Sequence, residues 1–167
     1  MTECAISSTV DAGSASDLVV RLQRSIKAPA AKVWGIVITP ETMRSWLGPQ
    51  VFEPQLGGRV LIDVLHGSRA DGVRQRWLMF GNIVTLDQDR ELAFTWQEFN
   101  VNDLTCWPAP TTVSITLEPQ DGGAATLVTL SHRGFDALPN SRQEYEGYAE
   151  GWSSLNDLDS LAKMCET

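Results

Sequence analysis

The feature that most constrains the fold is one apolar stripe near the carboxyl end of the chain. Apolar side chains recur there every three or four residues, the spacing that places them on one face of an α-helix. Ser141 and Glu144 precede the stripe in the order of a capping box, which predicts the start of the helix. The predicted helix has about 20 to 23 residues, enough to cross a whole sheet. The stripe consists of Tyr145, Tyr148, Trp152, Leu155, Leu158 and Ala162.

The middle of the chain has the pattern of consecutive β-strands. Apolar and polar residues alternate in segments separated by short turns rich in Gly, Pro, Asp and Ser, which is typical of an antiparallel meander. A further strand is predicted over 18–26, and two short helices that begin near Pro29 and Pro40 follow it. The strands of the meander are predicted over 60–65, 75–86, 91–99, 111–118 and 125–133.

This order of elements predicts an α+β fold. A curved antiparallel sheet would wrap around the long C-terminal helix, with the two short helices after the first strand. No Ser- or Pro-rich linker interrupts residues 18–167, so we expect a single domain there and a flexible leader over residues 1–17. A curved sheet and a helix commonly leave a cavity between them, so a pocket is expected beside the helix.

Composition excludes several classes of function. With 13 Lys and Arg against 21 Asp and Glu, the net charge of -8 disfavours nucleic acid as a partner. No apolar run approaches the ~20 residues of a membrane span. Three widely separated cysteines indicate a reducing, cytoplasmic location. Only two histidines are present, too few for a multi-histidine metal site, so we expect neither a metal nor a cofactor.

Seven short motifs occur in order between about residues 18 and 163. They are 26–34, 39–41, 46–49, 56–58, 92–96, 113–118, and 134–135 followed by 147–152. In this order they resemble the activator of heat-shock protein 90 ATPase homologue-like domain, which belongs to the START-related, birch-pollen-allergen-like helix-grip superfamily. The resemblance implies a helix-grip fold with a largely hydrophobic pocket between the sheet and the long helix.

The resemblance also implies a ligand, a small hydrophobic or aromatic molecule in that pocket. Tyr148 and Trp152 are expected in its wall, because the helix face that meets the sheet also meets the cavity, and the family pattern turns Trp96 inward. Trp46 either lines the pocket or packs in the core, and Trp107 either folds over the opening as a lid or lies on the surface against the next strand. The full set of expected ligand-binding residues is Trp46, Val64, Trp77, Trp96, Trp107, Tyr148, Trp152 and Leu155.

Few polar residues are placed to act on such a ligand. The candidates are His66, His132 and Glu98, each of which lies on a predicted strand or at its end and has a purely structural role as its alternative. An enzyme of cyclase or hydrolase type is therefore a second hypothesis. A third is a protein-interaction module that contacts a chaperone. Family members with that activity carry a separate amino-terminal domain, for which 167 residues leave no room. Both a monomer and a homodimer remain compatible with the sequence.

Overall fold

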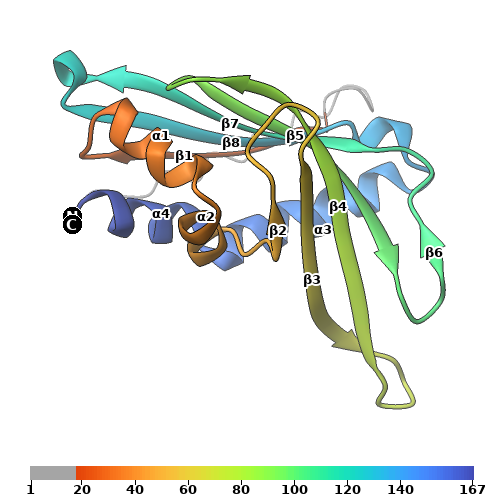
Figure 1. The fold of residues 1–167 in the computed structure, drawn as a ribbon. Helices are drawn as coiled ribbons and strands as arrows, with labels where there is room; N and C mark the ends of the chain where they lie inside the picture. Colours follow the sequence, from red (N-terminus) through yellow and green to blue (C-terminus); the bar gives the residue numbers. More distant parts are fainter. Residues whose placement is uncertain (1–17) are drawn as a thin grey trace.

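The computed structural model describes residues 18–167, and the leader expected over residues 1–17 lies outside this part of the chain. Within the described residues, eight strands form an antiparallel sheet in the order β1-β8-β7-β5-β4-β3-β2, with β6 paired to β5 (Figure 1). The strands are β1 Val20–Ile26, β2 Val51–Phe52, β3 Arg59–Ser68, β4 Arg74–Asp87, β5 Glu91–Asn100, β6 Thr105–Cys106, β7 Thr111–Gln120 and β8 Ala125–Arg133.

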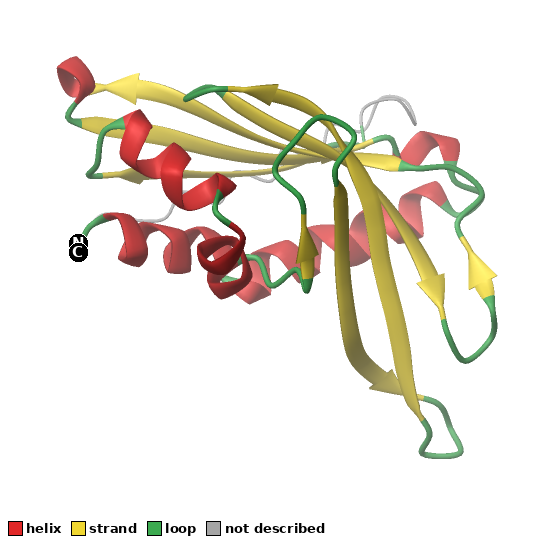
Figure 2. Cartoon of the chain, viewed as in Figure 1, coloured by secondary structure: helices red, strands yellow, loops and turns green. Residues whose placement is uncertain are grey.

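The helices lie against one face of this sheet. They are α1 Ala30–Ile38, α2 Pro40–Trp46, α3 Ser141–Leu155 and α4 Asp157–Cys165, with short 3-10 turns η2 Asp121–Gly123 and η3 Phe135–Ala137. Helices α1, α2 and α4 gather at one end of the sheet, and α3 runs from there toward the opposite end (Figure 2). The strands β3 and β4 extend past α3 as a long hairpin (Figure 1). The predicted α+β helix-grip fold is confirmed.

The C-terminal helix bends between α3 and α4, where the sequence predicted one uninterrupted helix. Asn156 has φ 56° and ψ 35°, a left-handed conformation that asparagine tolerates better than most residues and that ends α3. The predicted capping box is also absent: Ser141 is already helical, and Asn140 precedes the helix without a side-chain cap. As the last residue of α3, Leu155 is 65% exposed.

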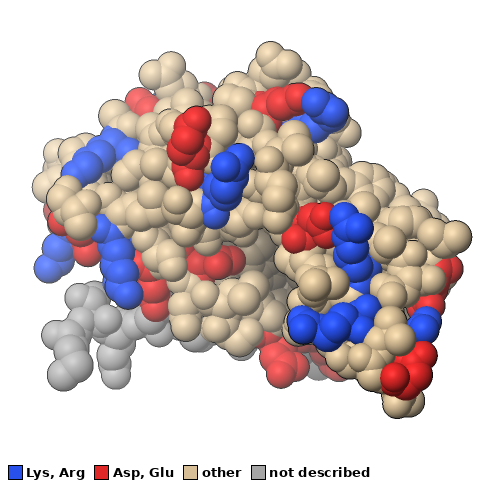
Figure 3. All heavy atoms as spheres, turned by 60° about the horizontal axis from the view of Figure 1, so that its bottom comes forward, with Lys and Arg blue, Asp and Glu red and all other residues tan. Residues whose placement is uncertain are grey.

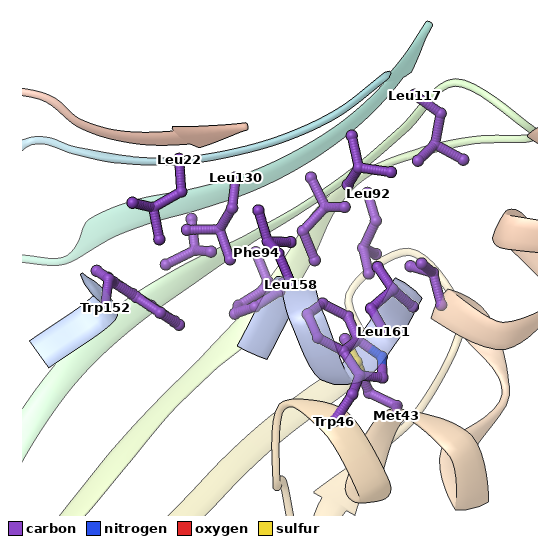
Figure 4. Close-up of a cluster of buried hydrophobic side chains, with 14 of the residues drawn as sticks. Leu22, Met43, Trp46, Leu92, Phe94, Leu117, Leu130, Trp152, Leu158 and Leu161 are labelled. Carbon is purple, nitrogen blue, oxygen red and sulfur yellow. The ribbon is translucent and has the colours of Figure 1, made fainter. Parts of the chain in front are cut away.

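The bend lets both helices turn apolar side chains toward the sheet. Figure 4 shows Trp152 of α3 and Leu158 of α4 below Leu22 and Leu130 of the sheet. Trp46 of α2 lies in the same core beside Met43 and Leu161 and is 3% exposed (Figure 4). Of its two sequence-based alternatives, pocket lining or packing, the structure places it in the packed core.

Close approach of β4 and β5 depends on a glycine. A Cβ atom on Gly81 would lie 1.7 Å from the carbonyl oxygen of Thr95, far inside van der Waals contact. The pairing of these strands also shifts between Ile83 and Thr85, an irregularity of the kind that bends a strand. Both features allow the sheet to curve around the helices and create its concave face.

Candidate functional site on the concave face

The register of the strands settles which side chains face the helices. Residues paired directly across an antiparallel ladder project to the same side of the sheet. Met79 pairs with Glu98, and Trp77 pairs both with Asn100 on one side and with Val64 on the other. Alternation places Glu98 and Trp96 on one face of β5, and Trp96 contacts α3 through its ring. All of these side chains therefore lie on the concave face.

Aromatic rings fill the space between β5, β8 and α3, where the pocket was expected. The centroids of His132 and Phe135 lie 4.5 Å apart, and those of His132 and Tyr148 lie 4.8 Å apart. Tilted and edge-to-face contacts of this kind hold rings in fixed orientations. The aromatic cluster, as we call it, consists of Trp96, Trp107, His132, Phe135, Tyr148 and Trp152.

Sequence reasoning found most of this cluster but missed Phe135. The only sequence signal for it is the Gly134-Phe135 pair. Gly134 immediately precedes η3 and has a left-handed backbone conformation, with φ 99°. A Cβ atom on Gly134 would lie 3.2 Å from the Cα atom of Thr111, so the glycine also permits close contact with β7. Phe135 is fully buried as a result.

His132 lies fully buried in the cluster, with both ring nitrogens hydrogen-bonded. The Thr111 hydroxyl donates to the carbonyl oxygen of Trp96 at 2.8 Å, so it accepts a hydrogen bond from His132 Nε2 at 2.7 Å. Trp152 Nε1 donates to His132 Nδ1 at 3.1 Å. This pattern requires the neutral tautomer protonated on Nε2. In agreement, burial lowers the pKa of His132 from 6.5 to about 3.

Glu98 and Tyr148 form a polar pair at the edge of the cluster. Trp96 Nε1 donates to the Tyr148 hydroxyl at 2.8 Å, and that hydroxyl donates to Glu98 Oε2. Burial, and then the neighbouring charge of Glu144, raise the pKa of Glu98 to about 7 against the lowering effect of Tyr148. Among the described residues, the second oxygen, Oε1, has no hydrogen-bond partner. The carboxyl therefore keeps one position free for an external group.

Replacing Tyr148 with Phe tests this hydrogen-bond chain. The change leaves the buried Trp96 Nε1 without an acceptor, so we expect the free energy of unfolding to fall by about 1 to 3 kcal/mol in urea titrations. Tyr145→Phe is the matched control, because Tyr145 is buried on the same helix and its hydroxyl has no hydrogen-bond partner among the described residues. Equal losses in the two variants would contradict a role for the chain.

Beyond the cluster, the concave face carries apolar side chains that are only partly covered. Val64, Trp77 and Met79 are half-buried, whereas residues deeper on the same face, such as Phe94 and Ile62, are buried. We call these three residues the outer concave wall. The molecular surface is hollowed between the helices and the β3–β4 hairpin, and the side chains in the hollow are mostly neither acidic nor basic (Figure 3). The wall and the Glu98–Tyr148 pair form the candidate site.

Other expected site residues lie apart from it. His66 is exposed near the tip of β3, and Leu155 is exposed at the α3–α4 bend. A separate pocket of about 30 Å³ lies at this bend, with room for about two water molecules. Its lining residues are Leu22, Gln23, Trp152, Ser153, Asn156, Asp157, Leu158 and Asp159.

Within residues 18–167 no group of three or more His, Cys, Asp or Glu side chains could hold a metal ion. In the same part of the chain, no helix is long and apolar enough to cross a membrane.

Solved structures share this fold at low sequence identity. Protein MLL2253 from Mesorhizobium loti is 23% identical with a TM-score of 0.63, covering 87% of this chain and 94% of its own. Protein Ms6760 from Mycobacterium smegmatis is also 23% identical, with a TM-score of 0.62 and coverages of 90% and 94%. The Aha1 dimer from Colwellia psychrerythraea is 16% identical, with a TM-score of 0.58 and coverages of 89% and 96%.

Sequence comparison identifies the family more specifically than these structures do. No curated protein is similar enough to match the chain. A family model, however, matches residues 27–166, from just after β1 to the end of α4, and so includes every strand of the sheet except β1 and all four α-helices. The chain belongs to the family described as Activator of Hsp90 ATPase homolog 1-like protein.

Proposed function

We propose that the protein binds a small hydrophobic or aromatic molecule on the outer concave wall. The observation that carries this proposal is the half-buried set of Val64, Trp77 and Met79 beside the Glu98–Tyr148 pair, on a face that the helices otherwise cover. Covering such a wall removes apolar surface from water, which is favourable by about 25 cal/mol per Å². Ligand sites typically combine apolar walls with a few fixed polar groups, as this arrangement does.

The Glu98–Tyr148 pair supplies orientation. The aromatic cluster holds the Tyr148 ring from several sides, and the Tyr148 hydroxyl in turn holds one oxygen of Glu98. The free oxygen of Glu98 can then accept a hydrogen bond from a hydroxyl or amine of the ligand. Because these partners are already ordered in the protein, little conformational entropy is lost when the ligand binds.

Two substitutions on one strand test the location of the site. Trp77 and Phe80 are both half-buried on β4, but they project to opposite faces of the sheet. We expect Trp77→Ala to weaken binding of the aromatic probe 2-acetylnaphthalene by about tenfold or more, because an indole at the centre of a site typically dominates its affinity. Isothermal titration calorimetry measures the dissociation constants.

Phe80→Ala is the control and should bind the probe with the affinity of the wild type. Equal weakening by both variants would show an effect on overall stability and not on the concave face. Undiminished binding by Trp77→Ala, or no binding by the wild type, would overturn the proposal. Native mass spectrometry of the purified protein adds an independent readout, because a small molecule retained from the host cell appears as a mass excess that is lost on denaturation.

A further inference from the structure

A buried carboxamide lies at the far end of the outer concave wall. Gln75 is two residues from Trp77 on β4 and so projects to the same face. It is 9% exposed. Asn100, which pairs with Trp77 on the neighbouring strand and is 2% exposed, is its hydrogen-bond partner. Two amide side chains are therefore buried together next to the proposed ligand surface.

The turn after β5 fixes the orientation of both amides. The backbone N–H groups of Asn102 and Asp103 donate to Asn100 Oδ1 at 2.9 and 3.0 Å. This oxygen therefore points into the turn, and Asn100 Nδ2 points toward Gln75, where it donates to Oε1 at 3.0 Å. If Gln75 were turned by 180°, two amino groups would face each other, so the observed orientation is the one that the hydrogen bonds allow.

This arrangement leaves the amino group of Gln75 without an acceptor. Its Nε2 atom is buried and has no hydrogen-bond partner in the described part of the chain. A buried donor without a partner is costly, and in native structures nearly every such group has a partner, either in the protein or in a bound molecule. Because Nε2 only donates, its missing partner must be an acceptor, and the oxygen of the adjacent Asn100 is already occupied by the turn.

We propose that Gln75 is a specificity-determining residue whose amino group binds a carbonyl oxygen of the ligand. This inference rests on the proposed function, because it assigns a chemical class to the molecule on the outer concave wall. Gln75 and Met79 lie about 13 Å apart along β4, with Trp77 between them. An apolar body against Trp77 can thus place its carbonyl group at Gln75 while its other end approaches Glu98, which pairs with Met79.

The charge of the surroundings favours an uncharged carbonyl over a carboxylate. The carboxyl groups of Glu98 and Glu144 lie near the same face, and neither forms an ion pair with Lys or Arg among the described residues. The whole chain carries a net charge of -8. This net charge repels an anionic ligand at long range, whereas a ketone, ester or amide oxygen satisfies the Gln75 donor without added charge.

Two probes of matched shape isolate this hydrogen bond. 2-Acetylnaphthalene carries a carbonyl oxygen where 2-isopropenylnaphthalene carries a methylene group. We expect the wild type to bind the ketone about tenfold more tightly than the alkene in isothermal titration calorimetry, the effect of one hydrogen bond to a buried donor. Gln75→Leu should bind both probes with nearly equal affinity, because it removes the donor and keeps an apolar side chain.

Two further variants make the result decisive. Gln75→Glu preserves an oxygen that accepts from Asn100 but replaces the donor with an acceptor, so it should also lose the preference, even if Gln75→Leu folds poorly. Gln88→Leu, at an exposed position in the turn between β4 and β5, should retain it. Circular dichroism verifies that each variant is folded.

Each outcome has one interpretation. Equal binding of the two probes by the wild type would overturn the inference and leave the proposed function standing. In that case the Gln75 amino group would donate its hydrogen bond to water and not to the ligand. A preference for the ketone that persists in both Gln75 variants would also overturn it. Failure of both probes to bind the wild type would overturn the proposed function, and this inference with it.

Discussion

Replacing Glu98 with Gln is expected to change the free energy of unfolding in a pH-dependent way. The change should be more favourable to the folded state at pH 8 than at pH 4, by about 3 kcal/mol. Burial raises the pKa of Glu98 from its ordinary value of 4.5 to about 7. Between these values the folded state holds a proton that the unfolded state has released. The stability contributed by Glu98 is therefore complete below about pH 4.5 and is lost as the pH rises through 7.

Urea titrations of the wild type and the variant between pH 4 and pH 8 measure this effect. The difference between the two proteins isolates Glu98, because other carboxyls with a raised pKa, such as Asp157 at about 6, are present in both. Glu150→Gln, at an exposed position on α3, controls for the loss of one negative charge. A pH-independent difference between the wild type and Glu98→Gln would show that Glu98 is not held in a desolvated environment.

Acidification should destabilise the protein through His132, with a slope of opposite sign. Its pKa is lowered from 6.5 to about 3 by burial, so between these values the unfolded state binds a proton that the folded state excludes. The stability contributed by His132 is complete above about pH 6.5 and is lost as the pH falls toward 3. Between pH 7 and pH 4, the wild type should lose about 3 kcal/mol more than a His132→Gln variant.

Glutamine suits this test because its amide can accept from Trp152 and donate to Thr111, as the neutral imidazole does. His66→Gln, at an exposed position, is the control. Nitrogen chemical shifts of the imidazole provide a second measurement that needs no variant: they should show a neutral ring protonated on Nε2 down to pH 4. An imidazolium signal at pH 5 would contradict the hydrogen-bond pattern.

The two residues also mask each other in the wild type. Between about pH 4.5 and 6.5 the Glu98 contribution decreases with rising pH while the His132 contribution increases, so the two slopes cancel. A flat profile in this range is therefore compatible with two strongly perturbed groups. Only the pair of single variants separates them, and they should then give slopes of opposite sign.

Local patterns in the sequence were sufficient for most of the fold. Strands predicted over 91–99, 111–118 and 125–133 correspond to β5, β7 and β8, because alternation is a local property of the chain. The short strands β2 and β6, of two residues each, are too short to show a period. The bend at Asn156 was missed because the apolar stripe continues in helical register on both sides of it.

The candidate site was only partly predictable. Trp96, Tyr148 and Trp152 were expected beside the long helix, and they do lie together in the aromatic cluster. The sequence offered no reason to connect Glu98 with Tyr148, which lie 50 residues apart. Nor did it single out Gln75, whose unpartnered amino group follows from a turn formed 25 residues later along the chain.

By itself, the sequence determined the fold class, the order of the longer strands and helices, and the family, because periodicity, turn residues and short motifs are local properties of the chain. For several strands, the tertiary structure alone decided which face meets the helices. Strands such as β4 carry apolar residues on both faces, so alternation leaves two equivalent choices. Only the register of β4 against β3 and β5, together with the position of α3, turns Trp77 and Gln75 inward and gives the concave face its polar groups.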